Sequence, residues 1–262
     1  MAQNVKVSII TPVKNCRGTI EKTIKSIKSQ TYNNIEYIII DGGSTDGTIE
    51  TIEKYSEINL FKGKDKSIAD AMNKGMKVAS GDIIGILNAD DYYLSNAIEE
   101  IVKNFEKFPN YVLHAGMRAF SDRDNFYDIP APENPNFLKG MVINHPTLFI
   151  PKKILIEYGD YDENYKIVGD WELCIRYYLA GVKFKSINKT ITHYLIGGIS
   201  TSRPDIVFNE MHKIRKKYKL YHLIDFRFIR EKILVLLLGN YVTKISHYKR
   251  IILFKIFNIL KR

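Results

Sequence analysis

The sequence predicts an α/β fold in which a mainly parallel sheet is flanked by helices. Short runs rich in β-branched residues alternate with stretches of helical spacing through the first 90 residues, a pattern typical of βαβ units. The expected strands span residues 5–10, 35–40, 58–61 and 82–87, and the expected helices span 19–30, 47–55 and 68–79. Crossovers of this length join parallel strands, so the loops that follow the strands should form a ligand crevice at one sheet edge.

Beyond residue 90 the pattern predicts a second group of elements. It favours helices over 97–108 and 170–180, strands over 112–120 and around 147–150 and 183–187, and a proline-rich loop over 128–135. With 262 residues, 45% of them hydrophobic, the chain is long enough for one large domain and an appendage. We place the domain at residues 1–205 and a tail at 206–262.

The positive charge is concentrated in the tail. Residues 206–262 carry 14 Lys and Arg against 3 acids, whereas residues 1–205 carry 25 against 26, although the whole chain has a net charge of +10. Apolar residues recur at helical spacing over 222–238 and 241–260, with cations between them. Two basic amphipathic helices are therefore expected. Such helices bind anionic membrane surfaces, and the alternatives are a helix packed on the domain or in a homodimer.

The cysteines and the chain start indicate a cytoplasmic location. Cys16 and Cys174 match no zinc or redox spacing, and we interpret both as free thiols in a reducing cytosol. No signal-peptide pattern opens the sequence, and no stretch reaches the roughly 18 apolar residues of a membrane-spanning helix. We expect a cytoplasmic protein bound peripherally at the inner face of the cell membrane.

An apolar run that ends on acid marks one candidate site. The segment 82–91 reads DIIGILNADD, a buried strand followed by an amide and two carboxylates. Acids at the rim of a parallel sheet can hold a metal-bound phosphate. The same residues are also common turn formers and helix caps, so the run alone leaves both interpretations open.

A glycine-rich loop follows the second expected strand. Residues 41–47 read DGGSTDG, and glycines there let backbone approach a ligand closely. No Gly-x-Gly-x-x-Gly follows the first strand and no Walker loop is present, which disfavours a Rossmann dinucleotide site and a P-loop. A plain turn with Asp46 capping the next helix is the structural alternative.

Four segments in order carry a family pattern. They are residues 7–15 (VSIITPVKN), 41–48 (DGGSTDGT), 70–75 (DAMNKG) and 88–91 (NADD). These segments resemble the successive motifs of family 2 glycosyltransferases, and the resemblance covers roughly residues 5–202. It is closest to the bacterial branch that builds O-antigen and capsule polysaccharides. The resemblance implies the GT-A fold, a Rossmann-like nucleotide-diphospho-sugar transferase fold with a mixed, mainly parallel sheet.

The resemblance also implies a role for individual residues of the donor site. Asp41 matches the acid that meets the uracil, and Asn88 and Asp90, on either side of Ala89, match the Asp-x-Asp motif. In that motif the last acid coordinates Mn²⁺ or Mg²⁺ and the earlier position faces the ribose. The remaining matches are Thr11, Pro12, Val13 and Asn15 in the first nucleotide loop, Gly43 and Ser44 beside Asp41, and Asp65, Lys66 and Asp70 to Asn73 in the segment that closes over uridine.

The chain departs from the family at Asn88, which replaces the first acid of the motif. An amide can bond a ribose hydroxyl but adds no charge, so the metal would be held mainly by Asp90, the sugar-nucleotide diphosphate and water, with Asp91 as a further candidate. A catalytically inactive scaffold is the alternative that this substitution raises.

A second acidic motif lies at residues 168–176, VGDWELCIR. By resemblance to the family's Glu-Asp motif, Asp170 is the general base that deprotonates the acceptor hydroxyl, and Glu172 is the fallback. Direct displacement by that hydroxyl inverts the anomeric configuration. Asp170 as the N-cap of the following helix is the structural alternative.

Three histidines and one loop complete the candidates. Some relatives use a histidine in the region of His193 to bind the metal or the diphosphate, whereas the nearest branch often lacks that histidine. His145 falls near the acceptor pocket of related enzymes, and a buried, hydrogen-bonded histidine is the alternative. His114 is expected to be a packed residue. Residues 197–203 suit a mobile lid or a plain loop.

The predicted function is transfer of a hexose, namely Glc, Gal or an N-acetylhexosamine, from a UDP-sugar to a lipid-pyrophosphate-linked sugar acceptor. Two alternatives are a nucleotidyltransferase that makes the sugar nucleotide and a nucleic-acid-binding protein that uses the basic tail. The acidic crevice and the lack of any recognised nucleic-acid motif count against the second, so no nucleic-acid partner is expected.

Overall fold

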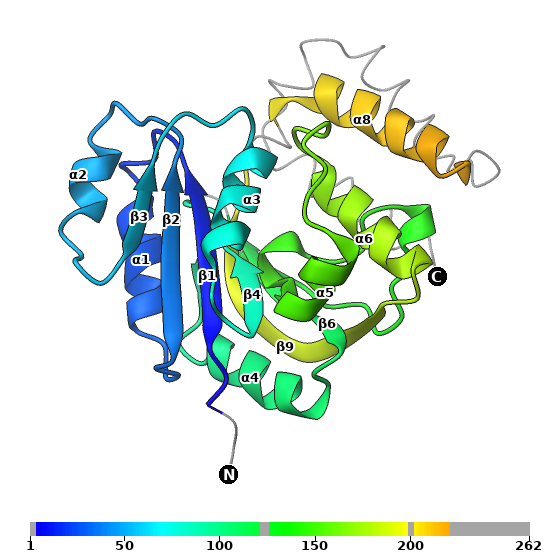
Figure 1. Ribbon diagram of the computed structural model, residues 1–262, viewed down its shortest axis with the longest axis horizontal. Helices are drawn as coiled ribbons and strands as arrows, with labels where there is room; N and C mark the ends of the chain where they lie inside the picture. The colour runs from blue at the N-terminus through cyan, green and yellow to red at the C-terminus, as the bar shows by residue number, and fades with distance from the viewer. Residues whose placement is uncertain (1–3, 121–125, 199–201, 221–262) are drawn as a thin grey trace. The chain divides into compact units, whose positions relative to one another are not determined.

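A computed structural model describes residues 4–120, 126–198 and 202–220 of the chain. In these residues nine strands form one mixed sheet (Figure 1), with the order β3-β2-β1-β4-β8-β6-β9-β5 and β7 paired with β6. The strands are β1 Val7–Val13, β2 Ile35–Asp41, β3 Asn59–Lys62, β4 Ile83–Ile86, β5 Tyr92–Tyr93, β6 Tyr111–Phe120, β7 Phe126–Ile129, β8 Phe149–Pro151 and β9 Lys183–Leu195.

The first half of the sheet is parallel, as predicted from the βαβ pattern. β1 lies between β2 and β4 and pairs with both in parallel, and β3 adds to β2 in the same direction. In the register of these pairs Val13 lies opposite Asp41, which lies opposite Lys62. The carboxyl ends of these strands therefore meet at one edge, where the candidate donor residues were expected.

Helices cover both faces of this half of the sheet. Because side chains alternate along a strand, Val7 and Ile9 of β1 join a core with the apolar residues of α1 and α4, whereas Ile10 faces α3. A Cβ built on Gly75 of α3 would lie 2.4 Å from Cγ2 of Ile10, so only glycine allows this approach. The helices are α1 Ile20–Lys28, α2 Thr48–Ile52, α3 Ile68–Val78, α4 Ala97–Lys107, α5 Lys152–Tyr158, α6 Gly169–Leu179 and α8 Pro204–Lys217, with 3-10 turns η1 Phe137–Lys139 and η2 His145–Thr147.

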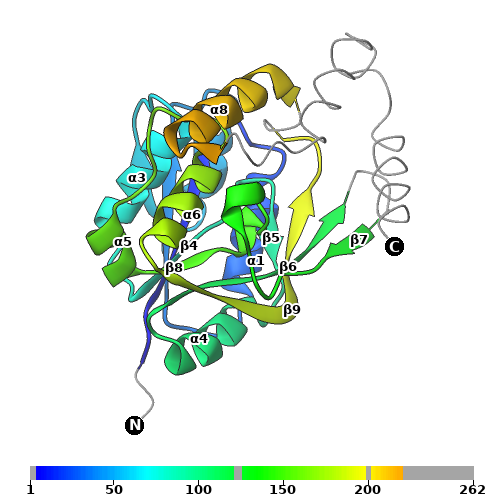
Figure 2. The same ribbon diagram turned by 90° about the vertical axis from the view of Figure 1, so that its right-hand side faces the viewer.

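Several predicted boundaries were wrong. β1 continues to Val13, so Thr11, Pro12 and Val13 belong to a strand rather than a loop. β9 extends eight residues beyond the expected end at 187, and β7 occupies the start of the expected loop at 128–135. The pairing of β6 with β9 shifts register between Ala115 and Met117. This shift interrupts the alternation of side chains between the two faces of the sheet, from which strands are predicted in a sequence. Figure 2 shows the long curved ribbons of β6 and β9 with β7 beside them.

The chain divides into two compact units, Met1–Ile214 and Arg215–Arg262. The first unit contains the whole sheet and runs past the expected boundary at 205. The expected amphipathic helices at 222–238 and 241–260 lie outside the described residues. Among the helices that the structure describes, none is both long and apolar enough to cross a bilayer.

His114 of β6 is fully buried, as expected, and both of its ring nitrogens are buried without a hydrogen-bond partner. Burial lowers the pKa of His114 to about 4 from the ordinary value of 6.5. Between these values the unfolded chain takes up a proton that the folded chain does not, so this residue makes stability fall as pH drops from 6.5 towards 4.

We expect this histidine to remove about 2 kcal/mol of unfolding free energy at pH 5 relative to pH 7.5, at 1.36 kcal/mol per pKa unit. Urea titrations at both pH values should show a smaller loss of unfolding free energy at pH 5 in His114→Leu, because leucine cannot titrate. An equal pH dependence in the variant and the wild type would contradict the assignment.

Candidate active site

Asp41, the last residue of β2, forms the centre of the first candidate loop. It is 1% exposed, and its Oδ1 accepts hydrogen bonds of 2.9 Å from the backbone N–H groups of Gly43 and Ser44. Gly43 has φ 86, a conformation that favours glycine. The other oxygen, Oδ2, is buried without a hydrogen-bond partner. One carboxylate oxygen thus fixes the loop, and the other has no hydrogen-bond partner in the protein.

The loops after β1 and β2 hold each other in place. The Asn15 N–H donates to Ser44 Oγ over 2.9 Å, and Asn15 Oδ1 accepts from the Thr45 N–H over 2.9 Å. Asn15 has φ 54, a left-handed conformation that asparagine tolerates better than most residues. The Thr11 hydroxyl accepts from Tyr37 inside the sheet. The two predicted nucleotide loops are therefore held together by the hydrogen bonds that Asn15 makes with Ser44 and Thr45. Thr11 lies in the buried strand.

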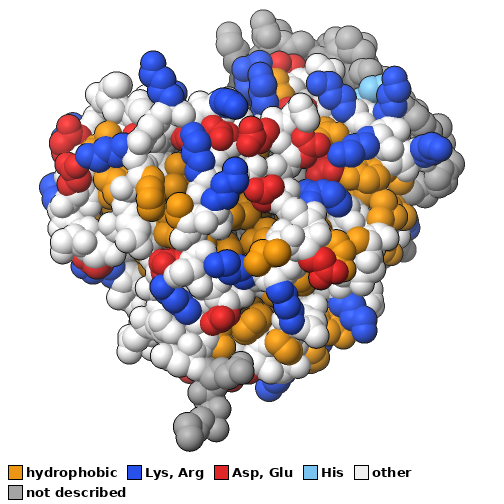
Figure 3. Space-filling view, in the orientation of Figure 1, with side chains coloured by type: hydrophobic (Ala, Val, Ile, Leu, Met, Phe, Trp, Pro, Cys, Tyr) orange, Lys and Arg blue, Asp and Glu red, His pale blue; other side chains and the backbone are white. Residues whose placement is uncertain are grey.

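The segment before and within α3 is held by charge pairs. Asp70 Oδ2 accepts from the Lys66 N–H over 2.8 Å, and Lys74 Nζ lies 2.6 Å from Asp65 and 3.0 Å from Asp70. The backbone hydrogen bond from Lys66 is the main cause that lowers the pKa of Asp70. Figure 3 shows acidic and basic side chains interleaved over the upper part of this face. These pairs fix the loop that was expected to close over uridine.

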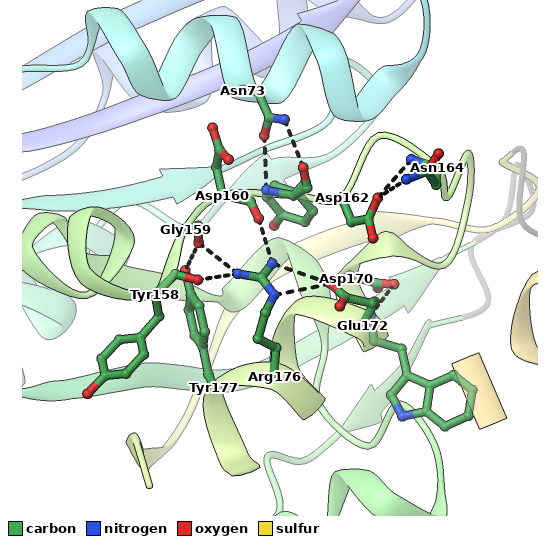
Figure 4. Close-up of polar contacts among 12 residues, drawn as sticks. Asn73, Tyr158, Gly159, Asp160, Asp162, Asn164, Asp170, Glu172, Arg176 and Tyr177 are labelled. Carbon is green, nitrogen blue, oxygen red and sulfur yellow. Dashed lines mark hydrogen bonds and ion pairs between the residues drawn. The ribbon is translucent and has the colours of Figure 1, made fainter. Parts of the chain in front are cut away.

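Asn73 of α3 bonds to a distant backbone segment. Its amide donates to the Tyr161 carbonyl over 2.9 Å and accepts from the Tyr161 N–H over 3.0 Å (Figure 4). Asn73 is 3% exposed. The structure thus uses this amide to join α3 to the segment before α6, a role that sequence reasoning missed because the partner lies 88 residues away. Direct contact between Asn73 and a nucleotide stays a prediction.

The acidic turn after β4 separates two carboxylates with different surroundings. Asp91 is fully buried, and it accepts from the Leu195 N–H over 3.0 Å and from Asn88 Nδ2 over 3.2 Å. Burial, with a smaller effect of Asp90, raises the pKa of Asp91 to about 8. Asp90 is half-buried, and burial raises its pKa as well. Asp91 therefore connects the turn to β9, and Asp90 is the acid that solvent and ligands can reach.

The donor set at this turn fits a divalent cation shared with a substrate. Within the described ranges no cluster of three or more His, Cys, Asp and Glu side chains could hold a metal. Mg²⁺ commonly binds through one or two carboxylates together with substrate phosphates, and Asp90 supplies one such carboxylate. Asn88 Oδ1 belongs to the same turn and is buried without a hydrogen-bond partner. A Cβ on Gly198 would lie 4.0 Å from Asp90 Oδ2, so the chain near the expected lid approaches this acid.

His193 lies among aromatic side chains on β9. Its Nδ1 is 2.9 Å from the Tyr92 hydroxyl, and its ring stacks on Tyr92 and meets Phe126 edge-on. Burial, then the cations Arg118 and Lys22, lower its pKa, which favours the neutral imidazole. A neutral imidazole can bind a metal, but the contacts of His193 are with this aromatic group, and its role as a ligand stays a prediction.

Asp170 is the second residue of α6 and interacts electrostatically with His145 of η2. The helix begins at Gly169 with Val168 as its N-cap, so the interpretation of Asp170 as the N-cap was wrong. Burial is the main cause that raises the pKa of Asp170, and the electrostatic influence of His145 opposes it. The 2.8 Å hydrogen bond between His145 Nε2 and the Tyr161 hydroxyl orients the histidine. A carboxylate with a raised pKa beside an oriented imidazole is suited to proton transfer.

Glu172, the fallback base, is part of a structural ion pair. It is fully buried, and its Oε2 accepts from Nε and Nη2 of Arg176 over 3.4 and 3.3 Å. The same guanidinium donates to the backbone carbonyls of Tyr158, Gly159 and Asp160 (Figure 4). The Glu172 carboxylate thus holds the arginine that fixes the segment 158–160, which favours Asp170 over Glu172 as the base.

Comparison with known proteins identifies the chain. The family model described as Glycosyl transferase family 2 matches residues 8–156, more than half of the sequence. The chain belongs to glycosyl transferase family 2. A similar relative of this glycosyltransferase is the Escherichia coli UDP-Glc:alpha-D-GlcNAc-diphosphoundecaprenol beta-1,3-glucosyltransferase WfaP, 31% identical over 75% of this chain and 80% of the relative.

Two solved structures resemble this family 2 glycosyltransferase. S. aureus TarS in complex with UDP-GlcNAc has a TM-score of 0.65 and 19% identity over 80% of this chain and 65% of that one. Mannosyltransferase PcManGT from Pyrobaculum calidifontis in complex with GDP-Man and Mn²⁺ has a TM-score of 0.61 and 16% identity, covering 82% and 64%. The chain thus spans just under two thirds of each neighbour. The predicted GT-A fold is confirmed.

Asn88 offers a test of the metal site in this family 2 glycosyltransferase. We expect Asn88→Asp to lower the Mn²⁺ concentration for half-maximal transfer by about tenfold, or about 1.4 kcal/mol, because a second carboxylate adds charge to the donor set. Without metal the variant should melt earlier than the wild type, since the new charge lies beside Asp90 and buried Asp91. Asn88→Ala is the control and should not gain metal affinity. An unchanged Mn²⁺ requirement in Asn88→Asp would place the metal away from residue 88.

Proposed function

We propose that this glycosyltransferase moves a hexose from a UDP-sugar to a lipid-pyrophosphate-linked glycan with inversion at the anomeric carbon, in the synthesis of a bacterial surface polysaccharide. The observation that carries the proposal concerns oxygens near the carboxyl ends of β2 and β4 that have no hydrogen-bond partner in the protein. Asp41 Oδ2 and Asn88 Oδ1 are buried without hydrogen-bond partners, and Asp90, two residues after Asn88, is half-buried. A nucleoside supplies donors for such acceptors, and a diphosphate with its cation supplies the charge for Asp90.

Each residue of the donor site binds a different part of the donor. Asp41 Oδ2 accepts the N–H of the uracil, Asn88 bonds a ribose hydroxyl, and Asp90 holds Mg²⁺ or Mn²⁺. When bound, such a cation neutralises the charge that develops on the leaving diphosphate. The acidic turn thus binds and orients the donor without forming a covalent bond to it.

Asp170 acts on the acceptor. Burial raises the pKa of the Asp170 carboxyl, which makes its ionised form a stronger base for the hydroxyl proton, and the electrostatic influence of His145 acts in the opposite direction. The hydroxyl oxygen attacks the anomeric carbon as the bond to the diphosphate breaks, and its proton passes to Asp170. One displacement inverts the configuration, so an α-linked donor gives a β-linked product.

A panel of donors tests the proposal. The enzyme is incubated with Mn²⁺, each UDP-sugar in turn and a GlcNAc-pyrophosphate-lipid analogue, and the product is examined for linkage by NMR. We expect transfer from one or a few UDP-hexoses and a β-linkage. A GDP- or TDP-sugar preferred over every UDP-sugar would overturn the nucleotide assignment, and a retained α-linkage would overturn the mechanism.

A lipid-linked acceptor gives the basic tail a role in membrane binding. Residues 206–262 carry the excess of 14 cations over 3 acids, and we propose that they bind the anionic inner face of the cell membrane. We expect the full chain to float with anionic liposomes and a chain truncated after Tyr221 to remain in the pellet. Equal flotation of the two would exclude the tail as the anchor, and light scattering of both proteins tests the alternative that the tail forms a homodimer.

A further inference from the structure

Glu210 of α8 is a buried carboxylate that binds the backbone just before α6. It is 4% exposed. Its Oε1 accepts from the Lys166 N–H over 2.6 Å, and its Oε2 accepts from the N–H groups of Ile167 and Val168 over 2.9 and 3.1 Å. Successive N–H groups that converge on one anion form a favourable site for its charge. One side chain therefore fixes three consecutive residues that lie 42 to 44 positions away in the sequence.

These three residues come directly before α6, the helix that contains Asp170. Val168 is the N-cap of α6, and Asp170 is the second residue of that helix. The earlier part of the segment is held from other elements, by Arg176 at the carbonyls of residues 158–160 and by Asn73 at Tyr161. Residues 166–168, which precede α6, are held by Glu210 of α8. The entry to α6 is thus fixed by a charge on a helix that follows the sheet in the chain.

We propose that Glu210 is a positioning residue, which holds residues 166–168 and so places Asp170 against the acceptor hydroxyl. The inference rests on the proposed function of Asp170 as the base. Glu210 acts through the backbone and has no contact of its own with the substrate in this proposal.

The charge of Glu210 also affects the pKa of Asp170, and this effect can be measured separately from protein stability. Glu210 is among the groups that raise the pKa of Asp170, while His145 lowers it. The other titratable groups that interact with Asp170, Tyr161 and Cys174, are buried, and burial raises the pKa of both, so they stay neutral at pH 7. Removing the charge at position 210 should therefore lower the pKa of Asp170.

The test compares Glu210→Gln with a matched change on the same helix. Glu210→Gln removes the charge but keeps one acceptor oxygen, which favours folding. Asp205→Asn removes a charge near the start of α8 where the side chain is 61% exposed and pairs with Arg203, and it is the control. The measurements are kcat and KM for transfer, Kd for UDP, hydrogen exchange of the amides at 166–168, and NMR titration of the Asp170 carboxyl.

In Glu210→Gln we expect kcat to fall 10- to 100-fold with Kd for UDP unchanged, because the hydrogen bonds that Glu210 makes to the described residues go to the backbone at 166–168. The amides at 166–168 should exchange faster, and the Asp170 titration and the acid limb of the pH profile should move to lower pH. Asp205→Asn should change none of these. A Glu210→Gln variant with a lower Tm but wild-type kcat and an unmoved Asp170 titration would overturn the proposal. If the wild type transfers no sugar, the proposed function fails, and the exchange and titration measurements still decide the role of Glu210.

Discussion

Asp170→Asn is expected to lower kcat for sugar transfer by about 10²- to 10⁴-fold, the range that a general base contributes. Asn keeps the size of the side chain and the oxygen that accepts from the Trp171 N–H, which lies 2.8 Å from Asp170 Oδ1. Burial raises the pKa of Asp170, so the ionised form is disfavoured in the folded protein. The neutral amide removes this cost, and the Tm of the variant should equal or exceed that of the wild type at pH 7.

Glu172→Gln is the matched control, with the opposite pattern expected. Glu172 is fully buried and paired with Arg176, and breaking a buried pair by neutralising one partner costs about 3–5 kcal/mol. We therefore expect a lower Tm and a partial loss of activity as the segment 158–160 loosens. Transfer assays and thermal melts of both variants separate chemistry from stability. An active Asp170→Asn together with an inactive, stably folded Glu172→Gln would assign the base to Glu172.

Local patterns were enough to predict the parallel half of the sheet and the edge where the donor residues meet. β1, β2 and β4 each carry an apolar run of their own, and short crossovers leave few ways to arrange them. The grouping of Asp41, Asn15 and Ser44 follows from that topology. β7 and the end of β9 could not be found in this way, because their residues are stabilised by pairing with β6 and carry no strong period of their own.

The roles that the sequence could not distinguish depend on contacts between distant residues. Asp90 and Asp91 are neighbours in the chain, and only the hydrogen bond from the Leu195 N–H to Asp91 shows which of the two is structural. Glu172 differs from Asp170 in a similar way, because its carboxylate is paired with Arg176. Glu210 carried one signal, an acid in a strongly basic tail, but its three backbone partners are visible only in the folded chain.

Asp90→Ala is expected to reduce transfer to background, a loss of at least about 10³-fold given the several kcal/mol that a bound cation contributes to charge stabilisation. The reason lies in the difference between the two acids of the turn. Asp91 is buried, which raises its pKa to about 8, and both of its oxygens accept hydrogen bonds within the protein, from the Leu195 N–H and from Asn88 Nδ2. Asp90 is half-buried and is the acid that a cation can reach.

Asp91→Asn tests this division directly. Because burial disfavours the ionised form of Asp91 and its Oδ1 accepts from the Leu195 N–H, an amide, which keeps that acceptor, should preserve most of the activity. The measurements are transfer rates of both variants across a Mn²⁺ series, with EDTA as the metal-free point, and calorimetry of UDP binding with and without Mn²⁺. Mn²⁺ should tighten UDP binding in the wild type and in Asp91→Asn but not in Asp90→Ala. Full wild-type activity in EDTA would contradict the metal site, and loss of the Mn²⁺ effect in Asp91→Asn alone would transfer the role of ligand to Asp91.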